Sequence, residues 1–136
     1  MMLRSATDAV GVGETFGAFS RQFILRWDGT TWMQVKGAPT DKRGHGETLN
    51  GVSASSATDV WAVGTSTHYR KVVDTPLIEH WDGTSWQRVT GLDPGGRFGT
   101  QLNGVSAVAP DDVWAVGSYG FQHSGASLSF IEHWNG

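Results

Sequence analysis

The sequence contains a long internal repeat, and this feature limits the possible folds more than any other. Residues 49–83 and 102–136 align without a gap at a period of 53 residues, and 17 of the 35 aligned positions are identical. The identities fall in three blocks, LNGVSA, DVWAVG and IEHW with its turn glycine, whereas residues 65–77 match their counterparts 118–130 nowhere. Such a chain is expected to fold as an array of one supersecondary unit.

A third, more divergent copy stands at the front of the chain. The segment SATDAVGVG (5–13) aligns with SATDVWAVG (56–64), and ILRWDGTTWMQV (24–35) aligns with IEHWDGTSWQRV (78–89). The unit therefore occurs about two and a half to three times.

Each unit is predicted to contain four short strands, which in the second copy cover residues 49–55, 59–65, 77–81 and 85–90. The second of these strands is apolar on both sides, with Val60 and Ala62 alternating with Trp61 and Val63. Because side chains of a strand point alternately to its two faces, this pattern predicts a strand that is covered on both faces.

Turn signals separate the predicted strands. Asp-Gly at residues 28–29 and 82–83 is typical of a two-residue type I′ hairpin and is expected to join the third strand to the fourth. Between the first and second strands, Asp59 and Asp112 are expected to accept hydrogen bonds from nearby backbone amides, as in an Asx-turn.

These patterns predict an all-β fold made of four-stranded antiparallel β-propeller blades, with about three blades in the chain. Blade 1 covers about 1–35, blade 2 about 49–89, and blade 3 about 102–136 without its outer strand. A β-sandwich is the main structural competitor, and the long repeat disfavours it. Since about four blades are needed to close a ring, we expect either further sequence or self-association, with a homodimer giving six blades.

The repeat blocks resemble a known family. The VWAVG strand followed by EHWDGTSW is similar to the kelch-like repeats of bacterial multi-blade proteins, and D-G-T-x-W is similar to the Asp-box of sialidase-type propellers. The resemblance covers nearly the whole chain. It implies propeller architecture and favours an extracellular setting.

Composition narrows the possible functions. Cysteine is absent, which excludes disulfides and thiol chemistry. The formal charge of -3 and the lack of a basic run make nucleic acid an unexpected partner. No apolar stretch is long enough to span a bilayer, and the first fifteen residues lack a signal-peptide pattern, so we expect a soluble protein that does not bind membranes.

The candidate binding residues lie in the unrepeated segments. In a propeller these segments emerge on one face, and variation on one face of a repeat array is typical of a binding surface. Aromatic, cationic and imidazole side chains there suit a glycan, a small molecule or a protein; they are Arg43, His45, His68, Tyr69, Arg70, Arg97, Tyr119 and His123. The competing interpretation is that these loops are polar and variable without binding anything.

No catalytic set, metal or cofactor is predicted. His45, His68 and His123 could converge on a metal ion, but nothing in their spacing requires one. The Glu-His pairs at 79–80 and 132–133 recur at one position of the repeat, which favours packing or hydrogen bonds between units over catalysis. The sequence thus predicts a non-enzymatic binding or scaffold module. The alternative is a fragment of a propeller enzyme such as a glycoside hydrolase or a galactose-oxidase-like protein.

Overall fold

The computed structural model describes residues 2–5, 8–40, 45–71, 73–96, 99–120 and 126–136, with backbone alone for 2–5. Within these residues the chain forms eleven β-strands and no helix, which confirms the predicted all-β class. The described part therefore offers no helix that could cross a membrane.

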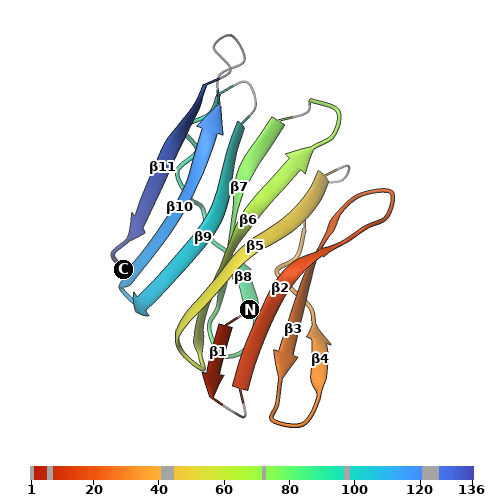
Figure 1. The fold of residues 1–136 in the computed structure, drawn as a ribbon, viewed down its shortest axis with the longest axis vertical. Helices are drawn as coiled ribbons and strands as arrows, with labels where there is room; N and C mark the ends of the chain where they lie inside the picture. Colours follow the sequence, from red (N-terminus) through yellow and green to blue (C-terminus); the bar gives the residue numbers. More distant parts are fainter. Residues whose placement is uncertain (1, 6–7, 41–44, 72, 97–98, 121–125) are drawn as a thin grey trace.

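The strands form three consecutive antiparallel meanders (Figure 1). The first meander contains β1 (Met2–Ser5), β2 (Asp8–Thr15), β3 (Arg21–Trp27) and β4 (Trp32–Val35). The second contains β5 (His45–Ser56), β6 (Asp59–His68), β7 (Val73–Trp81) and β8 (Trp86–Arg88), and the third contains β9 (Gly99–Ala109), β10 (Asp112–Gly120) and β11 (Ser127–Trp134). A single parallel bridge, Asp74 with Gly99, joins the second and third meanders into a seven-stranded sheet; neither this sheet nor the first is closed.

The meanders pack face to face through two hydrophobic cores, and β6 contributes to both. Val60 and Ala62 belong to the core against the first meander, whereas Trp61 and Val63 belong to the core against the third. All four side chains are at most 4% exposed. The prediction that this strand is covered on both faces is therefore confirmed.

The strands extend well beyond the repeated blocks, and here the sequence-based boundaries are wrong. The segment between the predicted strands 59–65 and 77–81 was expected to form a loop, but β6 and β7 stay paired as far as His68 and Val73. The third meander behaves in the same way, with β10 and β11 paired as far as Gly120 and Ser127. Threonine, serine and valine in the second meander's segment suit a half-exposed sheet, so the unrepeated sequence continues the strands.

The Asp-Gly turns also differ from the prediction. Trp81 pairs with Trp86, so the loop between β7 and β8 has four residues and is not a two-residue type I′ turn. Oδ1 of Asp82 accepts hydrogen bonds from the backbone N–H groups of Thr84 (2.8 Å) and Ser85 (2.9 Å), and Gly83 takes a φ of 97°. The Thr84 hydroxyl also donates to Oδ1 of Asp82, at 2.7 Å. This hydrogen bond and the two from the backbone lower the pKa of Asp82 to about 2.

The short repeated turns lie at one end of the molecule and the unrepeated segments at the other (Figure 1). We call these the repeated-turn end and the unrepeated end. This separation follows from antiparallel meanders whose strands alternate in direction, and it agrees with the sequence-based expectation.

Candidate functional site

The unrepeated end brings together His45, His68 and Tyr69, three of the eight side chains predicted from sequence. His45 is the first residue of β5, His68 is the last residue of β6, and the two residues are direct cross-strand partners. Both histidines therefore lie in strands, which corrects their expected place in loops. Arg43, Arg97 and His123 lie outside the described residues.

The two imidazoles lie against each other. Their ring centroids are 4.4 Å apart at an interplanar angle of 49°, and His45 Nδ1 lies 3.3 Å from the hydroxyl of Ser66. Nδ1 of His68 is buried and has no hydrogen-bond partner among the described residues. Buried polar atoms in folded proteins usually have a hydrogen-bond partner, so this nitrogen is the unsatisfied atom of the histidine pair.

Tyr69 extends this pair toward the first meander. Its ring packs against Phe19 with centroids 5.0 Å apart, and its hydroxyl oxygen accepts a hydrogen bond from the backbone N–H of Ser20 (3.2 Å). Gly46 makes this arrangement possible, because a Cβ at that position would overlap with the Tyr69 ring. Phe19 and Tyr69 are 40% and 41% exposed.

We call Phe19, His45, His68 and Tyr69 the loop-end cluster. Sequence reasoning missed Phe19, since nothing in its own segment shows that the loop after β2 lies beside the end of β6. The signal that could have found it is the exposure expected of an aromatic residue between alanine and serine in an unrepeated loop.

The other two described candidates are placed differently. Arg70 follows Tyr69 in the exposed turn after β6, at the margin of the cluster. Tyr119 lies within β10 of the third meander, where its ring meets Phe130 edge to face at 6.5 Å and packs on the core. It was expected in a loop, but it is paired with Leu128 of β11 in the third meander, whereas the loop-end cluster belongs to the first two meanders.

The second meander also holds a group of charged side chains whose carboxylates are buried. Glu47 and Glu79 are 5% and 0% exposed, and the guanidinium of Arg88 pairs with both carboxylates. Burial raises the pKa of Glu79, although the hydrogen bond from the backbone N–H of Ala38 and the charge of Arg88 act in the opposite direction. The backbone N–H of Glu47 also donates to the carbonyl of Ser20, so this group ties the first two meanders together.

The recurring glutamates are structural, as the repeat indicated. The backbone N–H of Ala38, in the linker that leaves the first meander, donates to Glu79 at 3.0 Å. The N–H of Leu92, in the linker that leaves the second meander, donates to Glu132 at 2.7 Å. Each glutamate thus holds the linker that leads into its own meander.

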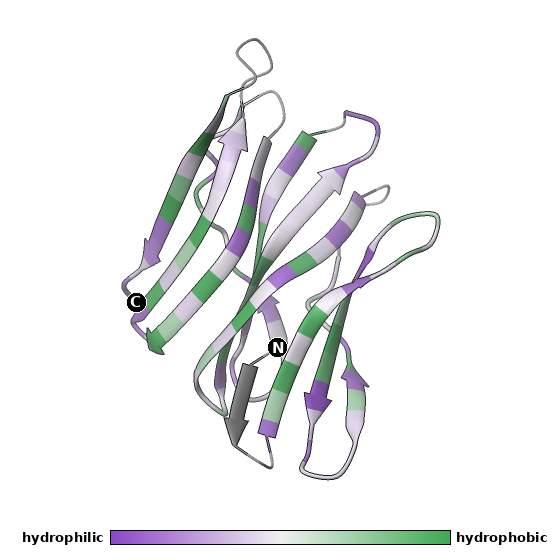
Figure 2. Cartoon of the chain, in the orientation of Figure 1, coloured by the Kyte–Doolittle hydropathy of each residue, from purple (hydrophilic) through white to green (hydrophobic). Residues whose placement is uncertain are grey.

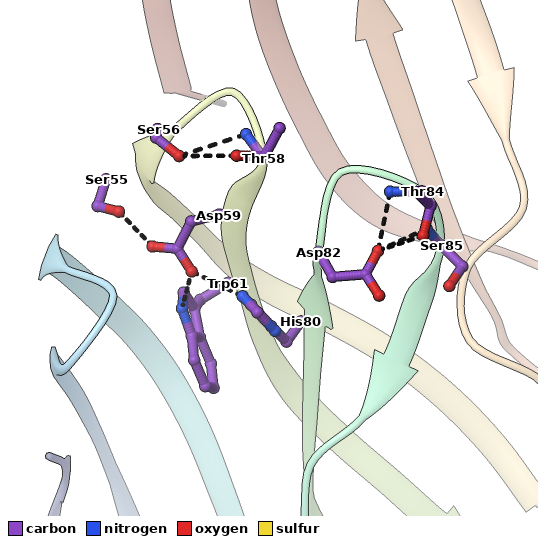
Figure 3. A network of polar contacts seen from close by, with 9 residues as sticks. All are labelled: Ser55, Ser56, Thr58, Asp59, Trp61, His80, Asp82, Thr84 and Ser85. Carbon is purple, nitrogen blue, oxygen red and sulfur yellow. Dashed lines mark hydrogen bonds and ion pairs between the residues drawn. The ribbon is translucent and has the colours of Figure 1, made fainter. Parts of the chain in front are cut away.

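The recurring histidines belong to a second structural network, which Figure 3 shows for His80. His80 Nε2 lies 2.6 Å from Asp59 Oδ1, which also accepts the indole N–H of Trp61 at 3.0 Å, and Ser55 donates to the other carboxylate oxygen. Asp112, Trp114 and His133 repeat the arrangement.

This network corrects the expected Asx-turn, because the aspartates bind side chains in place of local amides. Burial alone would raise the pKa of Asp59, but the bonds from Ser55, His80 and Trp61 together lower it. His80 follows Glu79 directly in β7, so the two side chains point to opposite faces and do not form a joint acid-base or metal site. The described residues include no group of three metal-binding side chains.

Comparison with models of known protein families, with curated proteins and with solved structures finds no match.

Proposed function

We propose that this chain is a non-enzymatic binding or scaffold module of β-propeller blades, which recognises a glycan, small molecule or protein through its unrepeated end. The observation that carries the proposal is the loop-end cluster. Two imidazoles and two half-exposed aromatic rings, taken from unrepeated segments of two meanders, meet on one surface. A few polar groups beside aromatic faces are typical of small-ligand sites.

The stacking of the meanders supports the propeller part of the proposal. The face that the second meander turns to the first carries Leu49, Val60, Ala62 and Leu77. At a spacing of 53 residues, the third meander turns Leu102, Val113, Ala115 and Phe130 to the second. The same face of the unit is used at both junctions, as in successive blades around an axis.

The opposite face of the third meander supports the proposed self-association. Trp114, Val116 and Ile131 are 44%, 46% and 63% exposed, whereas their repeat counterparts Trp61, Val63 and Ile78 are 4%, 1% and 7% exposed. Figure 2 shows hydrophobic residues recurring along β9 and β11 of this meander. We propose that a second copy covers this face and that two copies make a ring of six blades.

The ligand proposal is tested on an array of immobilised neutral and sialylated oligosaccharides. We expect labelled wild-type protein to bind a subset of them and His68→Ala and Tyr69→Ala to lose that binding. His133→Ala is the matched control, since His133 is a partly exposed histidine at the repeated-turn end. Binding that survives both cluster substitutions, or that His133→Ala removes equally, contradicts the proposal. Cleavage of the bound sugars would favour a propeller enzyme.

A further inference from the structure

The outer edge of the third meander is formed by β11, a strand of eight residues at the margin of the sheet (Figure 1). It pairs with β10 on one side, and no described strand pairs with its other side. In the first two meanders this edge is covered by a short fourth strand, β4 with four residues or β8 with three. β11 contains neither lysine nor proline, which often block pairing at an exposed edge. It can therefore accept a further strand.

The fourth strands of the first two meanders show how such a strand is held. Each begins with a tryptophan opposite the tryptophan that ends the third strand. Trp32 pairs with Trp27, and Trp86 pairs with Trp81. The ring centroids of these pairs are 5.6 Å and 6.0 Å apart. Trp134 is the counterpart at the end of β11, where no described residue pairs with it on the outer side and its side chain is 42% exposed.

A charged pair also joins the third strand to the fourth in the second meander. Glu79 of β7 lies opposite Arg88 of β8, with a carboxylate oxygen 3.9 Å from a guanidinium nitrogen. In the first meander the same two positions carry Leu25 and Gln34, which also pair. In both copies the fourth strand thus matches the third: a cation faces the glutamate, and a neutral residue faces the leucine.

The third meander has the glutamate, and no described side chain supplies the facing cation. Glu132 takes the place of Glu79, and its Oε1 accepts the backbone N–H of Leu92 at 2.7 Å. Its Oε2 is buried and has no hydrogen-bond partner among the described residues. Glu79 is 0% exposed beneath its fourth strand, whereas Glu132 is partly exposed. A negative charge therefore lies at the open edge of β11.

We propose that the outer edge of β11 binds an extended, basic segment of another protein, which adds to the third meander as an antiparallel fourth strand. The segment carries a tryptophan that packs on Trp134, a cation two residues later that faces Glu132, and an apolar residue directly after the cation. This order is that of residues 86–89 (WQRV) in the second meander. In strand addition, main-chain hydrogen bonds supply affinity and alternate side chains supply specificity.

The proposed occupant is a different protein because the described residues of a second copy offer no suitable segment. Both W-x-x-V strands of this chain, 32–35 and 86–89, are already paired within their own meanders. The inference concerns a strand edge, so it depends neither on the ligand of the loop-end cluster nor on the exposed sheet face.

The probe is a synthetic peptide with the sequence of residues 83–91 (GTSWQRVTG) and blocked termini. It is titrated into the ¹⁵N-labelled protein and followed by heteronuclear NMR. We expect saturable shifts centred on Glu132, His133 and Trp134, with a dissociation constant on the order of 0.1 mM. An absence of shifts at millimolar peptide, or shifts centred on the sheet face around Val116, would overturn the proposal.

Two N-methylated peptides test strand pairing itself. In the second meander the N–H of Val89 donates to the carbonyl of Ile78 at 3.0 Å. Hydrogen-bonded and non-hydrogen-bonded pairs alternate along an antiparallel ladder, so the N–H of Arg88 points away from β7. N-methylation at Val89 of the peptide should weaken binding about tenfold, because a main-chain hydrogen bond is lost. N-methylation at Arg88 is the matched control and should leave binding nearly unchanged. Equal effects would show that the peptide is not bound as a strand.

Glu132→Gln tests the role of charge, because glutamine keeps an acceptor for the N–H of Leu92. Wild type should bind the arginine peptide about fivefold more tightly than the Arg88→Gln peptide, whereas Glu132→Gln should bind both alike. Asp28→Asn, which changes the net charge equally in an exposed turn of the first meander, should keep the preference. A preference that survives in Glu132→Gln would refute the assignment of the cation. Should that variant fail to fold, the N-methylated peptides still decide the proposal, since they need only wild type.

Hydrogen exchange at the His133 amide distinguishes a different protein from a second copy. The alternation of the ladder directs this N–H toward the open edge, as it directs that of His80 toward β8. The amide should exchange rapidly in the protein alone at every concentration and become protected when the peptide is added. Protection in concentrated protein without peptide would mean that a second copy fills the edge, and the proposal would be wrong.

Discussion

Glu79 shows how a single ionisable side chain ties two repeats together. It is fully buried, accepts the N–H of Ala38 from the preceding linker and lies 3.9 Å from the guanidinium of Arg88. Burial raises its pKa above the ordinary value despite these favourable contacts. Ionisation of Glu79 therefore lowers the free energy of unfolding, and this loss of stability grows as pH rises.

We expect Glu79→Gln to reduce the pH dependence of folding stability. A carboxyl group whose pKa is raised binds its proton more tightly in the folded state than in the unfolded state. Its contribution to stability is therefore greatest below the unfolded value of 4.5 and is lost as pH rises through the folded pKa. Urea unfolding of wild type and variant between about pH 4 and about pH 7 measures the difference. Parallel stability curves for the two proteins would refute the expectation.

Gly64 and Gly117 mark the position where the first and second strands of a unit come closest. A Cβ at Gly64 would overlap with the carbonyl oxygen of Thr48, and a Cβ at Gly117 would overlap with that of Gln101. Gly13 occupies the same repeat position in the first meander, yet a Cβ there would meet nothing within 4 Å.

We therefore expect Gly64→Ala to destabilise the fold by about 2 kcal/mol, because the strand backbones must move apart. Gly13→Ala should change the free energy of unfolding by less than about 0.5 kcal/mol. Chemical denaturation of the two variants beside wild type gives the comparison. Equal losses at both glycines would mean that the close approach of the strands is not what requires glycine.

At the scale of strands, the repeated residues were predictable and the unrepeated ones were not. The alternation of Val60 with Trp61 predicts a two-sided strand, because period and apolarity are local properties. Pairing as far as His68 depends on a partner strand without repeat identity, so the expected loop was too long. The contact of Tyr69 with Phe19 depends on how two meanders dock, which no local pattern encodes.

The two central tryptophans of β6 and β10 should differ in their contribution to stability although they share one repeat position. Trp61 is 4% exposed and fills a core, so Trp61→Ala is expected to cost about 3–5 kcal/mol. Trp114 is 44% exposed, so Trp114→Ala in dilute protein should cost about 1 kcal/mol or less. Thermal or urea unfolding distinguishes the two cases, and similar losses would show that Trp114 is covered even in dilute solution.

For the whole molecule, the proposed self-association depends on the exposed apolar face of the third meander. Trp114, Val116 and Ile131 present the face that β6 and β7 bury in the second meander, and an apolar surface of this kind favours association. We expect light scattering at micromolar concentration to give about twice the chain mass of 14.7 kDa.

Ile131→Glu should return the mass to that of a single chain, because it places a charge in the middle of the proposed contact. Phe16→Glu is the control, since it puts the same charge on a residue that is 88% exposed at the unrepeated end, and it should leave the mass doubled. A wild-type protein that stays at 14.7 kDa would remove the six-bladed dimer. The loop-end cluster would still stand, because it lies between meanders of one chain.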